Sequence, residues 1–380
     1  ALLKFNPFLT LKILFEFLMT TIIHQIVSIP VESFEDWGRK RFGSTLYRLS
    51  FGNYTKKVWK TDPNRISKRF ASEKIQGFSF INLIKKLLRF GGQVTEPYYQ
   101  TWIYPKKGSG VMFIKLADRI RQLGGEIVLQ AQVTHAQVDN HKISNIKYRV
   151  DNEDRVIEAD LVVNTLSLPV FIGLLGERAP FSVRQHASKL RYISLVLVYV
   201  EFAKERIGED NWFYLLDDEF LSNRVTEQKN ISSFTMEPGK TVLSFELTCH
   251  GDDEFWTKSD EDIFGVVLAD CRKIPLLAQH IDAITDYTVR RAPKVYECYY
   301  KNFDAHAESV LGYVQKDVQN AVTIGRRGLF LQGDMHQSVE MGINMGSLLI
   351  KSMEEDALLS DFSKLKSDFY SRYVKYVDDI

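Results

Sequence analysis

Hydrophobic positions recur along the chain with two different periods, and the change of period divides it into segments. Up to about residue 103 the apolar residues follow helical spacing, with Phe42 and Leu46 four apart. Ser33 opens this run and Asp36 follows three residues later, a pattern that predicts a capped helix start. We therefore predict that residues 1–103 are mainly helical.

After residue 103 a glycine loop leads into an amphipathic helix, a Gly-Gly stop and runs rich in β-formers. The pairs Asp139-Asn140 and Asp151-Asn152 separate these runs and predict hairpin turns. The run Leu161-Val162-Val163 lacks polar alternation, which predicts a strand buried on both faces, as in a parallel sheet. A later apolar run, Leu329-Phe330-Leu331, predicts another strand, which a glycine turn connects to a helix.

The central part contains three further β runs, ISLVLVYVEF, WFYLL and TVLSFELTC, and a capped helix in SDEDIFGVVLADCRKI. One kind of sheet is thus left near residue 185 and re-entered near residue 306. This order predicts a mixed α/β (α+β) fold with two interleaved domains. One domain combines residues 104–185 and 306–380, and the other combines residues 1–103 and 186–305 in an antiparallel sheet with helices.

Composition narrows the class of protein. The 380 residues carry a formal net charge of +1, so no nucleic-acid partner is expected. Cys249, Cys271 and Cys298 are far apart and form no CxxC pair, which favours reduced thiols in a cytoplasmic protein. The histidines show no metal-ligand spacing, and we predict no metal.

An apolar stretch covers residues 6–30, but Lys12, Glu16 and His24 interrupt it. A membrane-spanning helix needs about 20 nearly uncharged residues. The stretch therefore predicts a buried or amphipathic helix and no integral membrane span, with peripheral membrane contact as the alternative. It also lacks the basic leader and cleavage site of a signal peptide.

The stretch LFLQGDMHQSVEMG, residues 329–342, has the order strand, glycine turn, helix start. Chains use this arrangement to hold phosphates, because a helix N-terminus favours negative charge in its ligand. Asp334 stands at that helix start and is itself negative. Taken alone, it is also a good helix N-cap.

Three segments resemble, in order, the later parts of the FAD-dependent amine oxidase and protoporphyrinogen oxidase superfamily: YPKKGSGVMFIKLADRIRQLGGEIVL, ADLVVNTLSLP and GRRGLFLQGDMHQSVEMG. FEDWGRKRFGSTLYRLSFGNYTKKVWKTDPNRIS is similar to the helical segment of its UDP-galactopyranose mutase-like branch. The resemblance covers nearly the whole chain. One departure is large: the G-x-G-x-x-G turn that opens the superfamily pattern does not occur here. We expect that the sequence is trimmed from a longer protein; the alternative is a chain that lost this clamp.

The resemblance implies FAD as the cofactor. It places Asp334 at the ribityl or ribose hydroxyls and Arg326 at the flavin or pyrophosphate, with the following helix directed at the flavin ring. Val133 would meet the adenine through its backbone, and Thr165 would lie near the phosphates. The implied cofactor residues are Val133, Thr165, Arg326, Gly333, Asp334, Met335 and Ser338.

The same resemblance implies a substrate cavity. In the mutases, an aromatic residue at the Tyr54 position stacks on uracil and one at the Trp59 position lines the cavity. Arg224 and Arg290 suit an anionic substrate. The resemblance places Tyr54, Trp59 and Gln332 at this cavity, and the charge and ring chemistry of Arg224, Arg290, Tyr296 and Tyr299 makes them further candidates for substrate contact. Core packing of the aromatics and a charged surface for the arginines are the alternatives.

These residues lead to three hypotheses. The first is an FAD-dependent oxidoreductase that transfers hydride on a small, sugar-linked or other substrate. The second is a flavin-dependent sugar isomerase like the mutases, which the residue at Gln332 weakens because the mutases place a tyrosine there. The third is a non-catalytic flavin-fold binding protein. No residue of the chain itself is predicted to be catalytic, because the flavin carries the chemistry.

Overall fold

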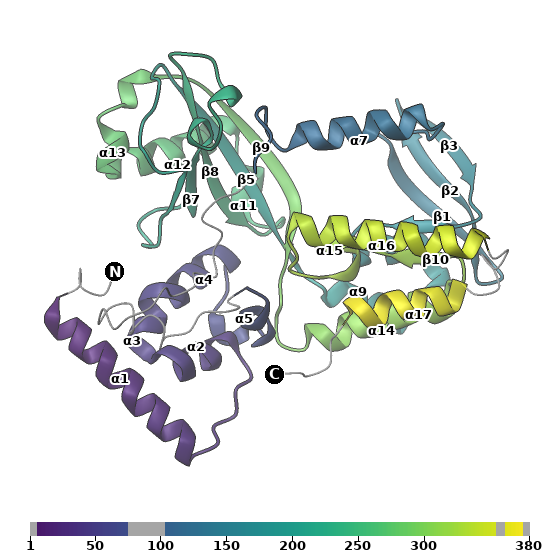
Figure 1. Cartoon of the computed structure of the whole chain (residues 1–380), viewed down its shortest axis with the longest axis horizontal. Coiled ribbons are helices and arrows are strands. Elements are labelled where there is room, and N and C mark those ends of the chain that lie inside the picture. The colour runs from purple at the N-terminus through teal and green to yellow at the C-terminus, as the bar shows by residue number, and fades with distance from the viewer. Residues whose placement is uncertain (1–5, 75–102, 355–361, 375–380) are drawn as a thin grey trace. The chain divides into compact units, whose positions relative to one another are not determined.

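The computed structural model describes residues 6–74, 103–354 and 362–374, and the chain divides into two interleaved units (Figure 1). Unit 1 combines Ala1–Glu126 with Tyr192–Tyr296, and unit 2 combines Ile127–Arg191 with Glu297–Ile380. The predicted order of segments is the same, but the boundaries lie at residues 126, 191 and 296 rather than at 103, 185 and 305. Part of the segment predicted as helical, residues 75–102, lies outside the described residues.

The first part of unit 1 is helical. Ser33 starts its second helix with the predicted capping box: the Ser33 Oγ accepts from the Asp36 N–H at 3.0 Å, and the Asp36 carboxylate accepts from the Ser33 N–H at 3.0 Å. The helices of this part are α1 (Pro7–Ile26), α2 (Phe34–Phe42), α3 (Ser44–Tyr47), α4 (Asn53–Trp59) and α5 (Arg69–Lys74). A π-helical turn, Arg48–Gly52, joins α3 to α4.

The second part of unit 1 is a five-stranded sheet in the order β6-β7-β8-β5-β9. Its strands are β5 (Tyr192–Phe202), β6 (Trp212–Tyr214), β7 (Arg224–Glu227), β8 (Thr241–Cys249) and β9 (Ile284–Glu297). The neighbours β6-β7, β7-β8 and β8-β5 are antiparallel. Successive side chains of a strand point to opposite faces, so the sheet has one apolar and one polar face.

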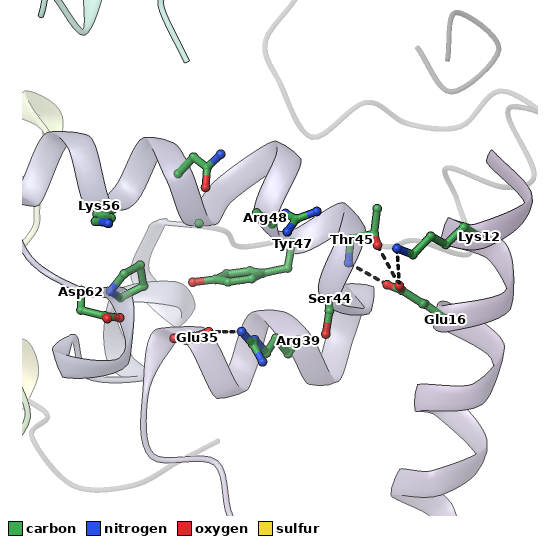
Figure 2. A pocket seen from close by; sticks show the side chains of 13 residues that line it. Lys12, Glu16, Glu35, Arg39, Ser44, Thr45, Tyr47, Arg48, Lys56 and Asp62 are labelled. Carbon is green, nitrogen blue, oxygen red and sulfur yellow. Dashed lines mark hydrogen bonds and ion pairs between the residues drawn. The ribbon is translucent and has the colours of Figure 1, made fainter. Parts of the chain in front are cut away.

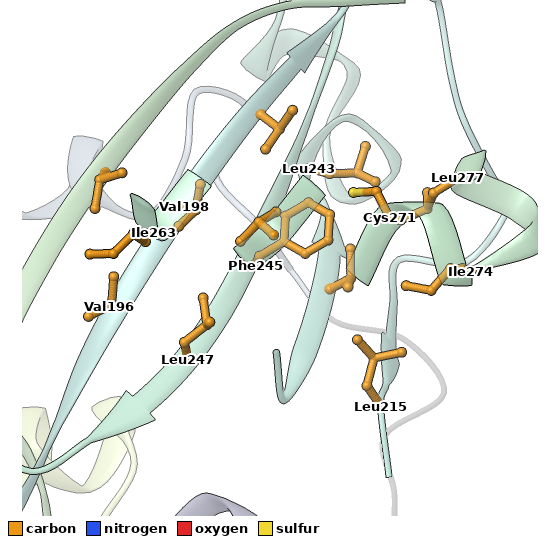
Figure 3. Close-up of a cluster of buried hydrophobic side chains, with 14 of the residues drawn as sticks. Val196, Val198, Leu215, Leu243, Phe245, Leu247, Ile263, Cys271, Ile274 and Leu277 are labelled. Atoms are coloured by element: carbon orange, nitrogen blue, oxygen red, sulfur yellow. The ribbon is translucent and has the colours of Figure 1, made fainter. Parts of the chain in front are cut away.

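The apolar face forms the core of this part of unit 1 (Figure 3). Val198 and Phe245 are fully buried cross-strand neighbours, and Ile263 and Cys271 of helix α12 (Asp260–Lys273) pack with them. Ser259 caps α12 by accepting from the Asp262 N–H at 3.1 Å, as the sequence predicted. The remaining helices here are α10 (Gln228–Ile231), α11 (Glu254–Thr257), α12 (Asp260–Lys273) and α13 (Pro275–Ala278).

Helix α7 (Gly110–Gln122) forms where the amphipathic pattern predicted it, yet none of its residues is buried. Phe113 is 47% exposed and Leu116 is 56% exposed. The part of the chain that the structure describes therefore leaves this apolar face uncovered.

Unit 2 contains two sheets. The predicted hairpins form an antiparallel sheet, β1 (Gln132–Asp139), β2 (Lys142–Val150) and β3 (Glu153–Glu158). Asn140 and His141 at the first turn, and Asp151 and Asn152 at the second, have positive φ, as two-residue hairpin turns require. The second sheet pairs β4 (Val162–Asn164) with β10 (Ala321–Thr323) in parallel.

Two predictions about these strands need correction. Val163 is 39% exposed, so β4 is not buried on both faces by the described residues. The run Leu329–Leu331 is not a strand: helix α15 (Gly325–Leu329) ends there, and Phe330 takes the left-handed conformation with φ 54°. The other helices of unit 2 are α8 (Leu168–Leu175), α9 (Phe181–Lys189), α14 (Phe303–Asp317), α16 (Met335–Glu354) and α17 (Phe362–Tyr373).

Candidate functional site

The polar face of the unit 1 sheet carries an ion pair beside a tyrosine. Arg224 of β7 lies opposite Glu246 of β8 and forms a hydrogen-bonded ion pair with it. Tyr214 of β6 lies opposite Arg224 on its other side, and its ring centroid is 6.0 Å from the guanidinium carbon. Three neighbouring strands thus contribute adjacent polar side chains to this face, because the pairing register aligns them.

Helix α4 brings two aromatic residues to this region of unit 1. The rings of Tyr54 and Tyr214 are 5.4 Å apart and nearly perpendicular, an edge-to-face contact. The rings of Trp59 and Tyr296 are 6.3 Å apart. Burial raises the pKa of Tyr54 above its ordinary value, so its hydroxyl stays protonated and can donate a hydrogen bond at neutral pH.

The two arginines of this region differ in how their charges are matched. The Arg224 charge is compensated by Glu246. Arg290 of β9 is exposed, and within the described part of the chain it has no ion-pair or hydrogen-bond partner. Burial, followed by the negative charge of Glu246, raises the pKa of Tyr199 of β5, and the positive charge of Arg290 lowers it in part. Arg290 is therefore the cation available to an incoming anion.

The structure thus gathers Tyr54, Trp59, Arg224, Arg290 and Tyr296 in unit 1. Together with Tyr214 and Glu246 they form what we call the Tyr54–Arg224 cluster. These last two residues were not identified from the sequence.

The missed members are Tyr214 and Glu246. A signal for Glu246 is present in TVLSFELTC, where Ser244, Glu246 and Thr248 occupy every second position of an otherwise apolar strand. Such alternation marks a polar face, and Glu246 is its one charged member. Tyr214 has no comparable signal, since WFYLL is aromatic throughout.

The other two predicted substrate residues belong to the interior of unit 2. Tyr299 is 1% exposed, its ring stacks on Phe303 at 3.9 Å, and its hydroxyl accepts from the Gln332 N–H at 2.9 Å. The Gln332 side chain is buried and donates to the Glu297 carbonyl. Tyr299 and Gln332 are therefore buried and hydrogen-bonded inside unit 2, and their contact with a substrate stays a prediction.

The carboxyl ends of β4 and β10 form a second candidate region, in unit 2. The Asn164 side-chain amide donates to Thr323 Oγ1 at 2.9 Å, and the Ile324 N–H donates to the Asn164 carbonyl at 2.9 Å. Gly328 of α15 fits closely against them, since an added Cβ would lie 2.7 Å from Thr323 Oγ1 and 3.2 Å from the Asn164 oxygen. Only glycine lets α15 approach these strand ends.

The loop that follows β4 carries polar side chains at this edge of the sheet. Thr165 is exposed, as its predicted contact with a ligand requires. The Ser167 hydroxyl is buried and has no hydrogen-bond partner among the described residues. Buried polar groups in proteins are nearly always hydrogen-bonded, so this hydroxyl indicates a missing partner at the strand ends.

The start of helix α16 supplies the third element of unit 2. Asp334 occupies the N-cap position and is exposed, and the Gln337 side chain accepts from its N–H at 2.6 Å. This is the half of a capping box in which the Gln337 side chain caps the Asp334 N–H, and capping by the Asp334 carboxylate itself stays a prediction. Gly333 is buried, Met335 is 49% exposed, and the Ser338 N–H donates to the Asp334 carbonyl.

Arg326 and Val133 are placed differently. The Arg326 Nε lies 3.7 Å from the carboxylate of Glu297, which is fully buried, so part of its charge is directed at a group within unit 2. Val133 pairs with Tyr148, and the register shifts between Val133 and His135. A bulge of this kind frees backbone groups from the regular ladder, as a backbone contact with a base needs.

The three cysteines are buried in the structure. Burial raises the pKa of Cys249 to about 11 and that of Cys271 and Cys298 to about 12, so these thiols are unreactive near neutral pH. Over the described ranges, no three His, Cys, Asp or Glu side chains gather as metal ligands.

The chain matches the model of one protein family over most of its length. The model of the family described as flavin containing amine oxidoreductase matches residues 29–344. Among curated proteins, none matches the chain.

Several solved structures share the fold. One is a reduced UDP-galactopyranose mutase, with a TM-score of 0.74 at 13% identity over 96% of this chain and 76% of that one. A protein from Exiguobacterium sp. described as a protoporphyrinogen oxidase gives a TM-score of 0.61 at 16% identity, with coverages of 89% and 73%. A putrescine oxidase variant gives 0.54 at 12% identity, with coverages of 97% and 77%.

Proposed function

Because the chain belongs to the flavin-containing amine oxidoreductase family, we propose that it is an FAD-dependent oxidoreductase whose small substrate binds at the Tyr54–Arg224 cluster. The observation that supports this most is the gathering of aromatic rings, a matched ion pair and an unmatched arginine on one face of the unit 1 sheet. Ligand sites typically combine such flat apolar surfaces with a few placed polar groups.

The residues of unit 2 fit the flavin cofactor of the family. When bound, FAD accepts hydride from a substrate and passes the electrons to an acceptor. The strand ends of β4 and β10 and the start of α16 are the kind of edge where α/β sheets bind nucleotides. The Ser167 hydroxyl, which has no hydrogen-bond partner among the described residues, and the exposed Asp334 carboxylate supply a donor and an acceptor for phosphate and hydroxyl groups.

The substrate's chemistry follows from the charges of the cluster. Arg224 and Glu246 cancel, so Arg224 offers directed N–H groups with little net charge. Arg290 keeps its full charge and suits a carboxylate or phosphate. Tyr54 and Tyr214 offer ring surface and hydroxyl groups beside these cations. We therefore propose a small anionic substrate with an apolar or ring-shaped portion.

The test uses the protein loaded with FAD under anaerobic conditions. Candidate anions are mixed with the oxidised protein, and loss of the visible flavin absorbance reports hydride transfer. The variant Arg290→Gln should raise KM about tenfold or more with little change in kcat, because it removes binding shared by ground and transition states. A protein that takes up no FAD, or a variant whose KM is unchanged, contradicts the proposal.

A flavin-dependent isomerase of nucleotide sugars is the second candidate. A tyrosine ring beside an arginine is also what a nucleoside diphosphate sugar needs. Burial of Gln332, which stands where the mutases carry a substrate-binding tyrosine, speaks against it. If the protein converts UDP-galactopyranose only after its flavin is reduced, the isomerase is the correct function and the oxidoreductase proposal is wrong. Tight FAD binding without any flavin reduction would favour the non-catalytic hypothesis.

A further inference from the structure

Helix α1 exposes its more apolar face. Its outward side chains are large and hydrophobic, with Phe8, Leu11, Phe15, Leu18, Ile22 and Ile26 between 42% and 82% exposed. Ile13 is its one fully buried residue among those described. Of the two expectations for this stretch, a buried or an amphipathic helix, the buried one is therefore wrong. The segment Pro7–His24 is long and apolar enough to cross a membrane by length and composition.

The inward side of α1 is the more polar one. The Glu16 carboxylate accepts from the Thr45 N–H at 2.6 Å and from the Thr45 hydroxyl at 2.7 Å, and Lys12 lies 3.9 Å from it. Figure 2 shows the interactions of the Glu16 carboxylate with Thr45 and Lys12 as dashed lines. Gly43, with φ 76°, allows this approach, because an added Cβ would lie 3.0 Å from the Glu16 Cβ. The helix is thus fastened through polar contacts while its apolar face points outward.

The segment that contains α1 carries an excess of positive charge. The chain as a whole carries +1, but residues 7–71 contain eleven lysines and arginines against five aspartates and glutamates. A pocket of about 330 Å³ beside α1 is lined by four basic residues, Lys12, Arg39, Arg48 and Lys56, and by three acidic ones, Glu16, Glu35 and Asp62 (Figure 2). Arg39 is paired with Glu35, whereas Arg48 and Lys56 have no ion-pair partner among the described residues.

We propose that α1 docks the protein on the surface of an anionic phospholipid bilayer, with its outward face in the acyl boundary and the basic residues of 7–71 at the headgroups. Apolar insertion and attraction to anionic lipid act together in peripheral helices of this kind. A second copy of the chain is the less suitable occupant, because pairing through α1 would bring two segments with the same excess of positive charge together.

The contacts of Glu16 favour a helix that lies on the membrane over one that spans it. Glu16 is central in α1, and spanning would place its carboxylate in the hydrocarbon or pull it from Thr45. A charged group there is costly. Lying in the interface leaves both hydrogen bonds in place and still buries the outward face.

Vesicle flotation tests the proposal directly. The protein is mixed with vesicles of phosphatidylcholine plus phosphatidylglycerol, or of phosphatidylcholine alone. We expect binding to the anionic vesicles that weakens with salt. Combining Phe15→Glu with Leu18→Glu should lower the partition coefficient about 100-fold, since removing each large side chain from the contact costs about a factor of ten. Phe181→Glu is the matched control for Phe15→Glu alone, because each adds one negative charge and Phe181 of α9 is 67% exposed and Phe15 63%.

Equal flotation of Phe15→Glu and the control would overturn the proposal, as would binding independent of lipid charge. Light scattering of the unbound protein detects a dimer. If the wild type is dimeric and does not bind vesicles, and the double variant is monomeric, the exposed face of α1 binds a second copy instead. A fluorophore on Leu18→Cys should be quenched by lipids brominated near the headgroup more than by those brominated at the chain ends. The reverse order would mean a spanning helix. Flavin binding and turnover are not read in these assays, so failure here leaves the proposed oxidoreductase function intact.

Discussion

Replacing Gly328 by alanine tests the packing of the unit 2 strand ends, where we place part of the cofactor site. The new Cβ would lie 2.7 Å from Thr323 Oγ1 and 3.2 Å from the Asn164 oxygen, which belongs to the backbone and cannot rotate away. Thr323 is fully buried, its hydroxyl donates to the Gly328 carbonyl at 2.7 Å and it accepts from Asn164. Either this hydroxyl or helix α15 must move.

The expected cost can be assembled from these contacts. Losing two hydrogen bonds of the Thr323 hydroxyl costs about 2 kcal/mol, and inserting a methyl group into a packed site costs about 1–3 kcal/mol. Alanine is favoured over glycine in a helix by about 1 kcal/mol. Gly328→Ala should therefore lower the free energy of unfolding by about 2–4 kcal/mol.

Urea denaturation measures this cost, and two comparisons make it specific. Gly312→Ala in α14 meets no atom within 4 Å and should stabilise the protein by up to about 1 kcal/mol. In a Thr323→Ala background the clash is relieved, so Gly328→Ala should cost at least about 1 kcal/mol less there. The reasoning is refuted if the cost is the same in both backgrounds, or if Gly328→Ala behaves like Gly312→Ala.

Three further predictions address charge. Burial lowers the pKa of Lys366 to about 8, against 10.5 in the unfolded chain, so its charge destabilises the fold below about pH 8 and ceases to do so as the pH rises. The wild type should therefore gain about 2–3 kcal/mol of unfolding free energy relative to Lys366→Met between about pH 7.5 and 10.5. A difference between the two proteins that stays constant across that range would contradict a charged buried lysine. Asp334→Ala should weaken FAD binding about tenfold in equilibrium dialysis, whereas unchanged occupancy would contradict a contact between the exposed Asp334 carboxylate and the cofactor. Glu227→Ala should cost about 3 kcal/mol in thermal and urea unfolding, because it deprives the N–H groups of Ile207 and Gly208 of their acceptor, and a cost below about 1 kcal/mol would contradict this.

Local signals predicted the parts of the fold that depend on neighbouring residues. The capping box at Ser33, the cap at Ser259 and the Asp151-Asn152 hairpin turn are confirmed, since each depends on residues within a few positions of one another. The first hairpin turn is displaced by one residue to Asn140-His141, which the pair Asp139-Asn140 does not reveal.

Features set by distant residues could not be read in the same way. Gln332 is buried because Tyr299 accepts its N–H and the Glu297 carbonyl accepts its amide, contacts that span more than thirty positions. The sequence left open whether α1 is buried or amphipathic for a related reason: a periodic pattern shows which side of a helix is apolar but not which side meets the protein. Glu16 decides that orientation, through a residue 29 positions away.

The parallel pair β4–β10 has a consequence for biosynthesis. Asn164 and Thr323, which close this pair, are 159 residues apart. At a ribosomal rate of about 5–20 residues per second, β4 leaves the ribosome about 8–30 s before its partner strand exists. Throughout that interval the nascent chain presents Val162 and Val163 on an unpaired edge, which can join other extended segments. We expect this protein to depend on chaperones that hold the emerging chain until β10 has been made.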